Sequence, residues 1–197
     1  MMILGVLNLL KFFRKTNSTR LILKKSVVVI LIALLTACSN TNWREASREP
    51  AGIAADPVIE KKAVIEVYVA DAFSWRGWFA VHTWIAIKSQ DAAEYTVYEV
   101  VGWRVSSGLP ALREYKTITP DTYWYGAKPK KVLSIIGAKA NKLIPRIADA
   151  VARYPWANEY TLFPGPNSNT FPQWVGLQVP ELGLELPFRA LGSGYAD

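Results

Sequence analysis

Residues 78–88, with the sequence WFAVHTWIAIK, contain the alternation of side chains that decides the fold. Every second position carries a β-branched side chain: Val81, Thr83, Ile85 and Ile87. His82 falls on the opposite side, together with Trp84 and Ala86. Successive side chains of an extended chain point to opposite faces, so this spacing predicts a β-strand with two different faces.

Two neighbouring segments, residues 63–71 and 94–103, are also rich in β-branched and aromatic residues and are predicted strands. Short connections separate the three segments, which favours an antiparallel meander. Residues 104–130 contain several glycines and prolines, so we expect mostly loop there, with a further strand around 113–118.

From Pro129 onward the apolar spacing becomes helical, and the side chains that fall on one side are Val132, Ile135, Ile136, Ala140, Leu143, Ile144, Ile147 and Val151. Pro145 removes a hydrogen bond inside this segment, so we expect a kink or two abutting helices. Tyr154-Pro155 should end it. The predicted fold is α+β, with an antiparallel sheet followed by helices in a single domain, residues 63–197.

The basic residues of the chain gather near its beginning. The chain has 23 Lys and Arg against 16 Asp and Glu, a net charge of +7, but six of the basic residues precede Cys38 and no acidic residue does. The remaining part has 17 basic and 16 acidic residues, a net charge of +1. A nucleic-acid partner is therefore not expected, because phosphate binding needs a basic face.

Residues 1–37 have the layout of a secretory signal, with a basic stretch followed by the apolar run 27–35. The residues LTAC at 35–38 resemble a lipobox, which implies that Cys38 carries diacylglycerol and becomes the first residue. Ser39 then implies an outer-membrane lipoprotein facing the periplasm. Residues 38–62, polar and with two prolines, are predicted to be a flexible tether. An uncut leader that serves as an anchor is an alternative, and so is a true start downstream of Met1.

Residues 164–171, PGPNSNTF, combine a rigid turn with four residues suited to cap a helix. With Ser168 or Asn169 as the N-cap, Ser168 would lie at the positive end of a helix dipole, beside backbone N–H groups able to stabilise an oxyanion. Ser168 is therefore a candidate nucleophile. The same run is also typical of a turn and cap without any catalytic role.

His82 is the only histidine, so serine or water chemistry near neutral pH would use it as the general base. Glu99, on the next predicted strand, could orient its ring. The alternative is a partly buried histidine that is hydrogen-bonded for structure. One histidine and one cysteine give little support for a metal site, and we expect no cofactor because the chain has no phosphate loop or dinucleotide fingerprint.

All eight tryptophans follow Cys38, and Tyr123-Trp124-Tyr125 lies in the long predicted loop. Aromatic faces of this kind bind sugars or apolar ligands, but they also pack the core of a small domain that has no disulfide. Trp84 and Trp124 are the candidates for lining a groove, with Asn167, Asn169 and Thr170 as further binding residues.

Residues 64–195 resemble a family of bacterial envelope proteins of unknown function. The matching residues are VHTWI at 81–85, VVGW at 100–103, WYG at 124–126, Tyr154-Pro155, PGPNSNTF at 164–171, Leu186-Pro187 and ALG at 190–192. The order of an early-strand histidine and a later Asn-Ser-x-Thr-Phe segment is similar to that in circularly permuted papain-like proteins of the NlpC type, which have cysteine where this chain has Ser168.

The papain-like resemblance implies a groove and leaves two functions open. One is a non-catalytic envelope lipoprotein that binds peptidoglycan, a peptide or a lipid. The other is a serine-variant amidase, peptidase or acyltransferase that uses Ser168 and His82. The first is favoured, because a serine hydroxyl is much less acidic than the thiol that it replaces.

Overall fold

A computed structural model describes residues 42–197 of the chain. The predictions for the leader, Cys38 and Ser39 lie outside these residues. None of the helices in the described part is both long and apolar enough to cross a bilayer.

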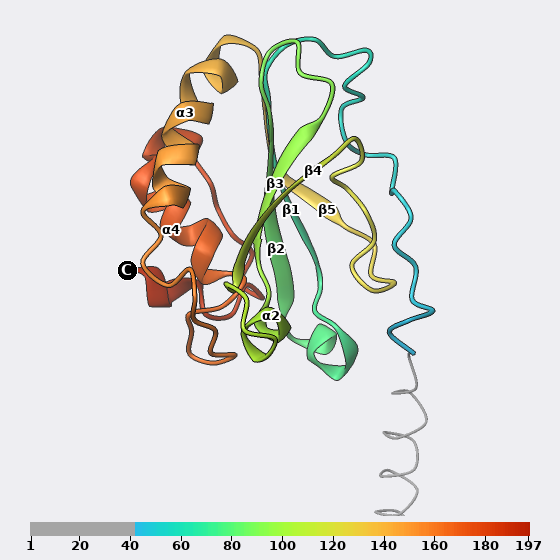
Figure 1. Ribbon diagram of the computed structural model, residues 1–197, viewed down its shortest axis with the longest axis vertical. Coiled ribbons are helices and arrows are strands. Elements are labelled where there is room, and N and C mark those ends of the chain that lie inside the picture. Colours follow the sequence, from blue (N-terminus) through green and yellow to red (C-terminus); the bar gives the residue numbers. More distant parts are fainter. Residues whose placement is uncertain (1–41) are drawn as a thin grey trace, which may run out of the picture. The chain divides into compact units, whose positions relative to one another are not determined.

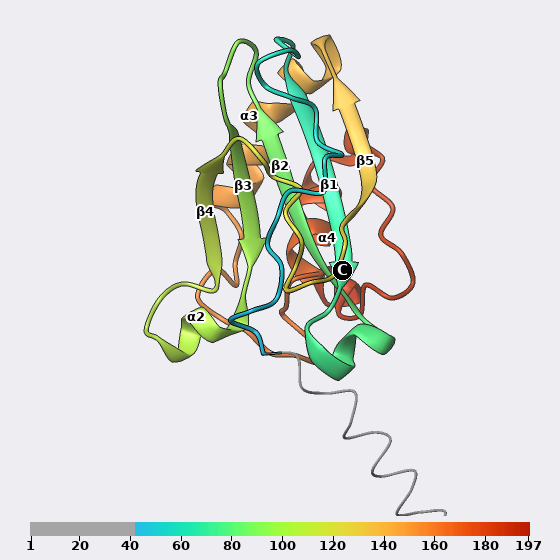
Figure 2. The ribbon, with the colours of Figure 1, turned by 90° about the vertical axis from the view of Figure 1, so that its right-hand side faces the viewer.

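Five strands form one antiparallel sheet in the order β4-β3-β2-β1-β5 (Figures 1 and 2). The strands are β1 (Val64–Asp71), β2 (Val81–Lys88), β3 (Tyr95–Val100), β4 (Leu112–Thr117) and β5 (Lys130–Ile136). The first three follow one another as the predicted meander, β4 is the further strand expected around 113–118, and β5 pairs with the free edge of β1. The predicted α+β class, with an antiparallel sheet and helices after it, is confirmed.

One prediction about this sheet is wrong: residues 130–136 form strand β5 and not the first turns of a helix. Val132, Ile135 and Ile136 have a spacing that fits a helix, but their β-branched side chains also suit a strand. The edge of β1 offers unpaired backbone groups, and pairing with them decides in favour of the strand. Gly137, with φ of 88°, then separates the strand from the helix that follows.

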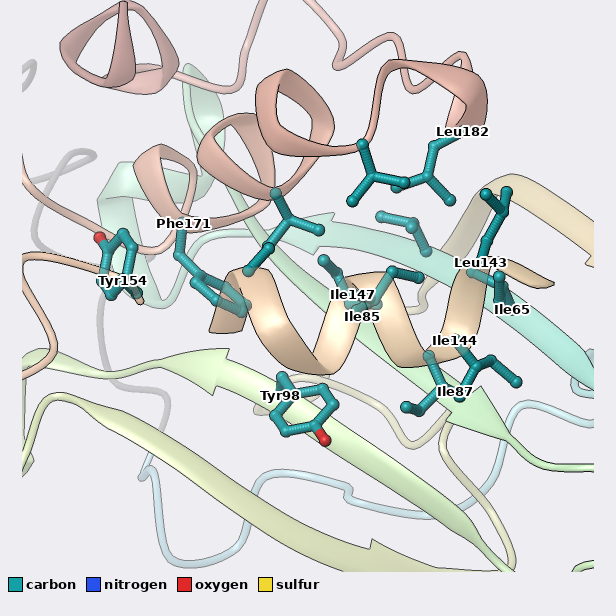
Figure 3. Close-up of a cluster of buried hydrophobic side chains, with 14 of the residues drawn as sticks. Ile65, Ile85, Ile87, Tyr98, Leu143, Ile144, Ile147, Tyr154, Phe171 and Leu182 are labelled. Carbon is teal, nitrogen blue, oxygen red and sulfur yellow. The ribbon is translucent and has the colours of Figure 1, made fainter. Parts of the chain in front are cut away.

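Helices α3 (Ala138–Ala152) and α4 (Thr170–Gln178) cover one face of the sheet (Figure 1). Pro145 lies inside α3, which is one helix and not two, and the helix ends just before Tyr154-Pro155 as expected. Leu143, Ile144 and Ile147 of α3 pack against Ile65, Ile85 and Ile87 of the sheet (Figure 3). Short helical turns complete the fold: α2 (Gly102–Ser106), η1 (Ser74–Trp78), η2 (Pro180–Leu182) and η3 (Ser193–Ala196).

The other face of the sheet is covered by the segment that precedes β1 (Figure 1). The Asp121 carboxylate accepts hydrogen bonds from the N–H groups of Ile53, at 2.6 Å, and Ala54, at 3.1 Å. The Tyr95 hydroxyl donates to the carbonyl of Ala55 at 2.8 Å. Residues 43–62, predicted to belong to a tether, are therefore part of the folded unit, because the domain satisfies their polar groups.

The connections β1–β2 and β3–β4 lie at the same end of the sheet, as antiparallel pairing requires. The first contains η1 and the second contains α2, and both lie at the lower end of the molecule in Figures 1 and 2. This end of the sheet carries the candidate site.

Candidate functional site

A pocket of about 520 Å³ opens at the end of the sheet where β2 begins and β3 ends. Its walls come from η1, α2, the loop before α4 and the loop before β5. Most of the lining is apolar, and the aromatic members are Phe73, Trp75, Phe79, Trp103, Trp124, Tyr160 and Phe163. The polar side chains are fewer and include His82, Asn167, Ser168 and Asn169. This composition is typical of a small-molecule site.

His82 and Glu99 meet on one face of the sheet. Trp84 of β2 lies opposite Glu99 of β3, and His82 lies two residues before Trp84 on the same face. The His82 Nε2 atom is 2.9 Å from Glu99 Oε2. Both residues are buried, so Glu99 holds the imidazole ring in one orientation.

Arg113 of β4 contacts Glu99 from the side opposite to His82, so His82, Glu99 and Arg113 form a polar row across three strands. Its Nε donates to Glu99 Oε1 at 2.6 Å, and a second guanidinium nitrogen pairs with the same oxygen. Burial alone would raise the pKa of the Glu99 carboxyl, but the hydrogen bonds and charges of His82 and Arg113 outweigh it and hold that pKa below its ordinary value. Glu99 is therefore an anion at neutral pH.

The Trp124 indole lies flat on the His82 ring, with 3.6 Å between the ring centroids and 6° between the planes. The Trp84 ring, also predicted to line the groove, stacks on the His82 ring with 5.8 Å between centroids and lies 6.3 Å from the Trp124 centroid. Trp84 is buried, stacks on Tyr68 and donates its N–H to the carbonyl of Pro120. The structure therefore places Trp124, but not Trp84, in the pocket wall.

Asn167 organises the turn that presents Ser168. Its Oδ1 accepts hydrogen bonds from the N–H groups of Asn169, at 2.9 Å, and Thr170, at 3.3 Å. Its Nδ2 donates to the carbonyls of Leu162 and Leu191 at 3.0 and 3.1 Å. Helix α4 begins after Asn169, one of the two predicted N-caps, but the side chain that binds the first free N–H groups belongs to Asn167.

Asn169 and Thr170 join α4 to the sheet and to the C-terminal segment. The Asn169 amide donates to the carbonyls of Val81 and Leu191, and its Oδ1 accepts a hydrogen bond from the Thr83 hydroxyl at 2.7 Å. The Thr170 hydroxyl donates to the carbonyl of Gly192 at 2.7 Å. Asn169 also lines the pocket and Thr170 does not, so Thr170 acts as a structural residue.

Ser168 and His82 line the same pocket, and each is 6% exposed. Of the hydrogen bonds within residues 42–197, none involves the Ser168 hydroxyl, so Ser168 and His82 are not hydrogen-bonded to each other. The predicted oxyanion donors are also reduced in number, because the Asn169 and Thr170 N–H groups are already bound by Asn167. Among the N–H groups of residues 167–170, that of Ser168 has no hydrogen-bond partner within the described residues 42–197.

Several contributors to the site were not anticipated, and Arg113 and Trp103 are two of them. Arg113 lies in the predicted strand at 113–118, directly opposite Glu99 on the neighbouring strand. Its charge is opposite to that of Glu99, so the pair could have been found once the two strands were aligned in register. Trp103 was predicted to be in a strand but belongs to α2, where it lines the pocket with its ring centroid 5.6 Å from that of Trp124. In the described part of the chain, no group of three or more His, Cys, Asp or Glu side chains is arranged to hold a metal ion.

Comparison with known proteins gives one match. The family described as "Protein of unknown function (DUF3750)" matches residues 62–195, more than half of the chain. No curated protein and no solved structure is similar enough to count as a match.

Proposed function

Because the chain belongs to the DUF3750 family, whose description names no activity, we propose a function from the pocket itself. The protein is a lipid-anchored protein of the bacterial cell envelope, on the outer membrane and facing the periplasm, that binds an apolar ligand without acting on it. The LTAC residues at 35–38 and the apolar leader before them support the anchor. The apolar, largely aromatic lining of the pocket is the single observation that supports binding.

The arrangement around Ser168 favours binding over catalysis. A serine nucleophile needs a base within hydrogen-bond reach and donors for the oxyanion. The Ser168 hydroxyl makes no hydrogen bond to His82, and Asn167 already binds two of the three N–H groups of the turn. Stacking under Trp124 and the bond to Glu99 also hold His82 as a part of the pocket wall.

Binding is tested with cis-parinaric acid, a polyene fatty acid that accepts excitation energy from nearby tryptophan. We expect saturable energy transfer from the pocket tryptophans. Trp103→Ala removes one wall of the pocket and should weaken binding about tenfold, which corresponds to about 1.4 kcal/mol. Trp78→Ala is the matched control, because Trp78 is 64% exposed and does not line the pocket. Equal affinities for the two variants, or no saturable transfer, would contradict the proposal.

One observation supports a second candidate function, that of an amidase, peptidase or acyltransferase: Ser168, His82 and Glu99 come from three separate segments and converge at one end of the sheet. In this scheme, Ser168 Oγ bonds to the substrate carbonyl carbon while its proton passes to His82. The bond to the leaving group breaks, the leaving group takes that proton, and water or an acceptor alcohol or amine then releases the acyl group from Ser168.

The two candidates give different results with p-nitrophenyl octanoate. Binding without chemistry predicts no release of p-nitrophenol above background and the same parinarate affinity for Ser168→Ala as for the unaltered protein. Catalysis predicts turnover that falls by a factor of about 100 or more in both Ser168→Ala and His82→Gln. Ser168→Cys is a further variant. If the serine site is inactive, a thiolate formed beside His82 would supply the nucleophile that the site lacks.

A further inference from the structure

Six large apolar side chains surround the mouth of the pocket and are exposed to solvent. We call Trp75, Trp78, Phe79, Trp103, Leu162 and Phe163 the apolar rim, and their exposed fractions run from 46% for Phe79 to 73% for Phe163. Single exposed apolar residues are ordinary, but a contiguous set of this size marks an interaction surface.

Topology gathers the rim at one end of the sheet. Trp75, Trp78 and Phe79 belong to η1 or follow it, Trp103 belongs to α2, and both connections lie at the end that carries the pocket. Leu162 and Phe163 come from the loop before α4, which packs closely on α2: a Cβ on Gly102 would lie 2.6 Å from the Tyr160 ring. Five of the six rim residues also line the pocket, so the rim and the mouth of the pocket are one surface.

The folded chain begins beside this surface. The Gly126 N–H donates to the carbonyl of Ser47 at 2.9 Å, and the Arg48 guanidinium lies 3.9 Å from the centre of the Tyr125 ring. The Tyr125 ring in turn lies 5.6 Å from that of Trp103 and 5.2 Å from that of Phe73. Figures 1 and 2 agree that the first described residues lie at the end that carries η1 and α2.

The distance from this end to the predicted anchor is short. The steps from Cys38 to Trp43, fully extended, span at most about 18 Å. A lipid on Cys38 would therefore hold the rim close to the headgroup region. Tryptophan and phenylalanine are the side chains that favour this interface, because their rings are apolar and the indole keeps an N–H for water.

We propose that the apolar rim docks into the surface of the bilayer, with the mouth of the pocket facing the lipid. This inference rests on the lipid anchor of the proposed function and adds a second point of attachment, which would fix the orientation of the domain on the bilayer. The opposite end of the sheet differs, because its exposed apolar side chains, those of Val58, Ile59, Ile118 and Ile136, are all aliphatic and do not line this pocket.

Single cysteines that carry an environment-sensitive fluorophore test the docking in the full-length protein. Trp78→Cys and Phe163→Cys place the probe on the rim, and Ile59→Cys is the control at the far end, where the replaced side chain is 80% exposed. Each labelled protein is reconstituted in vesicles of phosphatidylethanolamine and phosphatidylglycerol, with and without phosphatidylcholine that carries a nitroxide on its acyl chain. Intact mass reports whether Cys38 is acylated, and Cys38→Ser provides a single-thiol background if it is not.

We expect the acyl-chain nitroxide to quench the two rim probes at least about threefold more strongly than the Ile59 probe, because interfacial residues enter the bilayer by about 5–10 Å. Equal quenching of the rim and far-end probes would overturn the docking, even if the mass shows an acylated Cys38. An unmodified Cys38 with strong rim quenching would remove the anchor from the proposed function and leave the docking standing. Rim fluorescence that depends on protein concentration and resists the nitroxide would assign the rim to a second copy of the chain and also overturn the proposal.

Discussion

Replacing Asn167 with alanine is the perturbation for which the structure gives the clearest expectation. The side chain is 3% exposed and lies where the turn before α4 meets the C-terminal segment. Its two amide atoms together bind the N–H groups of Asn169 and Thr170 and the carbonyls of Leu162 and Leu191. Alanine keeps the backbone but removes all four bonds, and of the four groups only the Leu191 carbonyl keeps another partner within residues 42–197, the Asn169 amide.

The magnitude follows from the number of bonds. Each of the four hydrogen bonds contributes about 1 kcal/mol, and the groups left behind are largely shielded from water, so the loss is about 4 kcal/mol of unfolding free energy. For a domain of this size, 1 kcal/mol corresponds to roughly 2–4 °C, so the melting temperature should fall by roughly 8–16 °C.

Thermal unfolding followed by tryptophan fluorescence measures this loss. Asn141→Ala is the matched control, because Asn141 is exposed on α3, and its change should stay within about 0.5 kcal/mol. A fall of less than about 3 °C in Asn167→Ala, equivalent to one hydrogen bond or less, would refute the conclusion that Asn167 holds this turn. Asn167→Asp separates the two halves of the network, because the aspartate retains acceptors for the two N–H groups and loses both donors.

Two further substitutions test the polar row and the C-terminal segment that contains Gly192. Glu99→Gln should lower stability by about 3 kcal/mol at neutral pH, since it removes the buried anion that pairs with His82 and Arg113. Folding lowers the pKa of Glu99, so the ionised side chain stabilises the protein above the ordinary glutamate pKa of about 4.3, and this stabilisation is lost as the pH falls further. The melting temperatures of the Glu99→Gln variant and the unaltered protein should therefore converge in acid. A difference between them that does not change with pH would contradict this prediction. Gly192→Ala should cost roughly 2–3 kcal/mol, because Gly192 has φ of 89° and its Cβ would lie 2.1 Å from Asn167 Nδ2. Alanine at Gly108, which also has positive φ but open space around it, should cost clearly less in the same melting assay.

The parts of the fold that the sequence predicted well depend on local patterns. Alternation along residues 78–88 led to β2, and the capping residues before Thr170 led to the start of α4. The placement of Glu99 beside His82 also followed from two adjacent strands, because side chains on the same face of neighbouring strands lie within contact distance. The role of these residues in catalysis stays a prediction.

Residues 130–136 show where local pattern fails. Their apolar spacing is compatible with both a helix and a strand, so the choice depended on a partner distant in sequence, the open edge of β1. The segment 43–62 is similar: its polar composition indicates a tether, but the Asp121 carboxylate, the Tyr95 hydroxyl and apolar packing against the sheet hold it in the fold.

The sequence by itself determined the class of the fold, the strand that bears His82 and the helix start beside Ser168, because side-chain alternation and capping act over a few residues. Only the tertiary structure decided that Trp124 rather than Trp84 faces the pocket, that Asn167 binds Leu191 of the C-terminal segment, and that six apolar side chains surround one opening. These features depend on contacts between residues 22 to 86 positions apart, such as those of Asn169 with Leu191 and Thr83. No periodicity in a single segment records such contacts, since they arise only when the sheet, the helices and the C-terminal segment pack together.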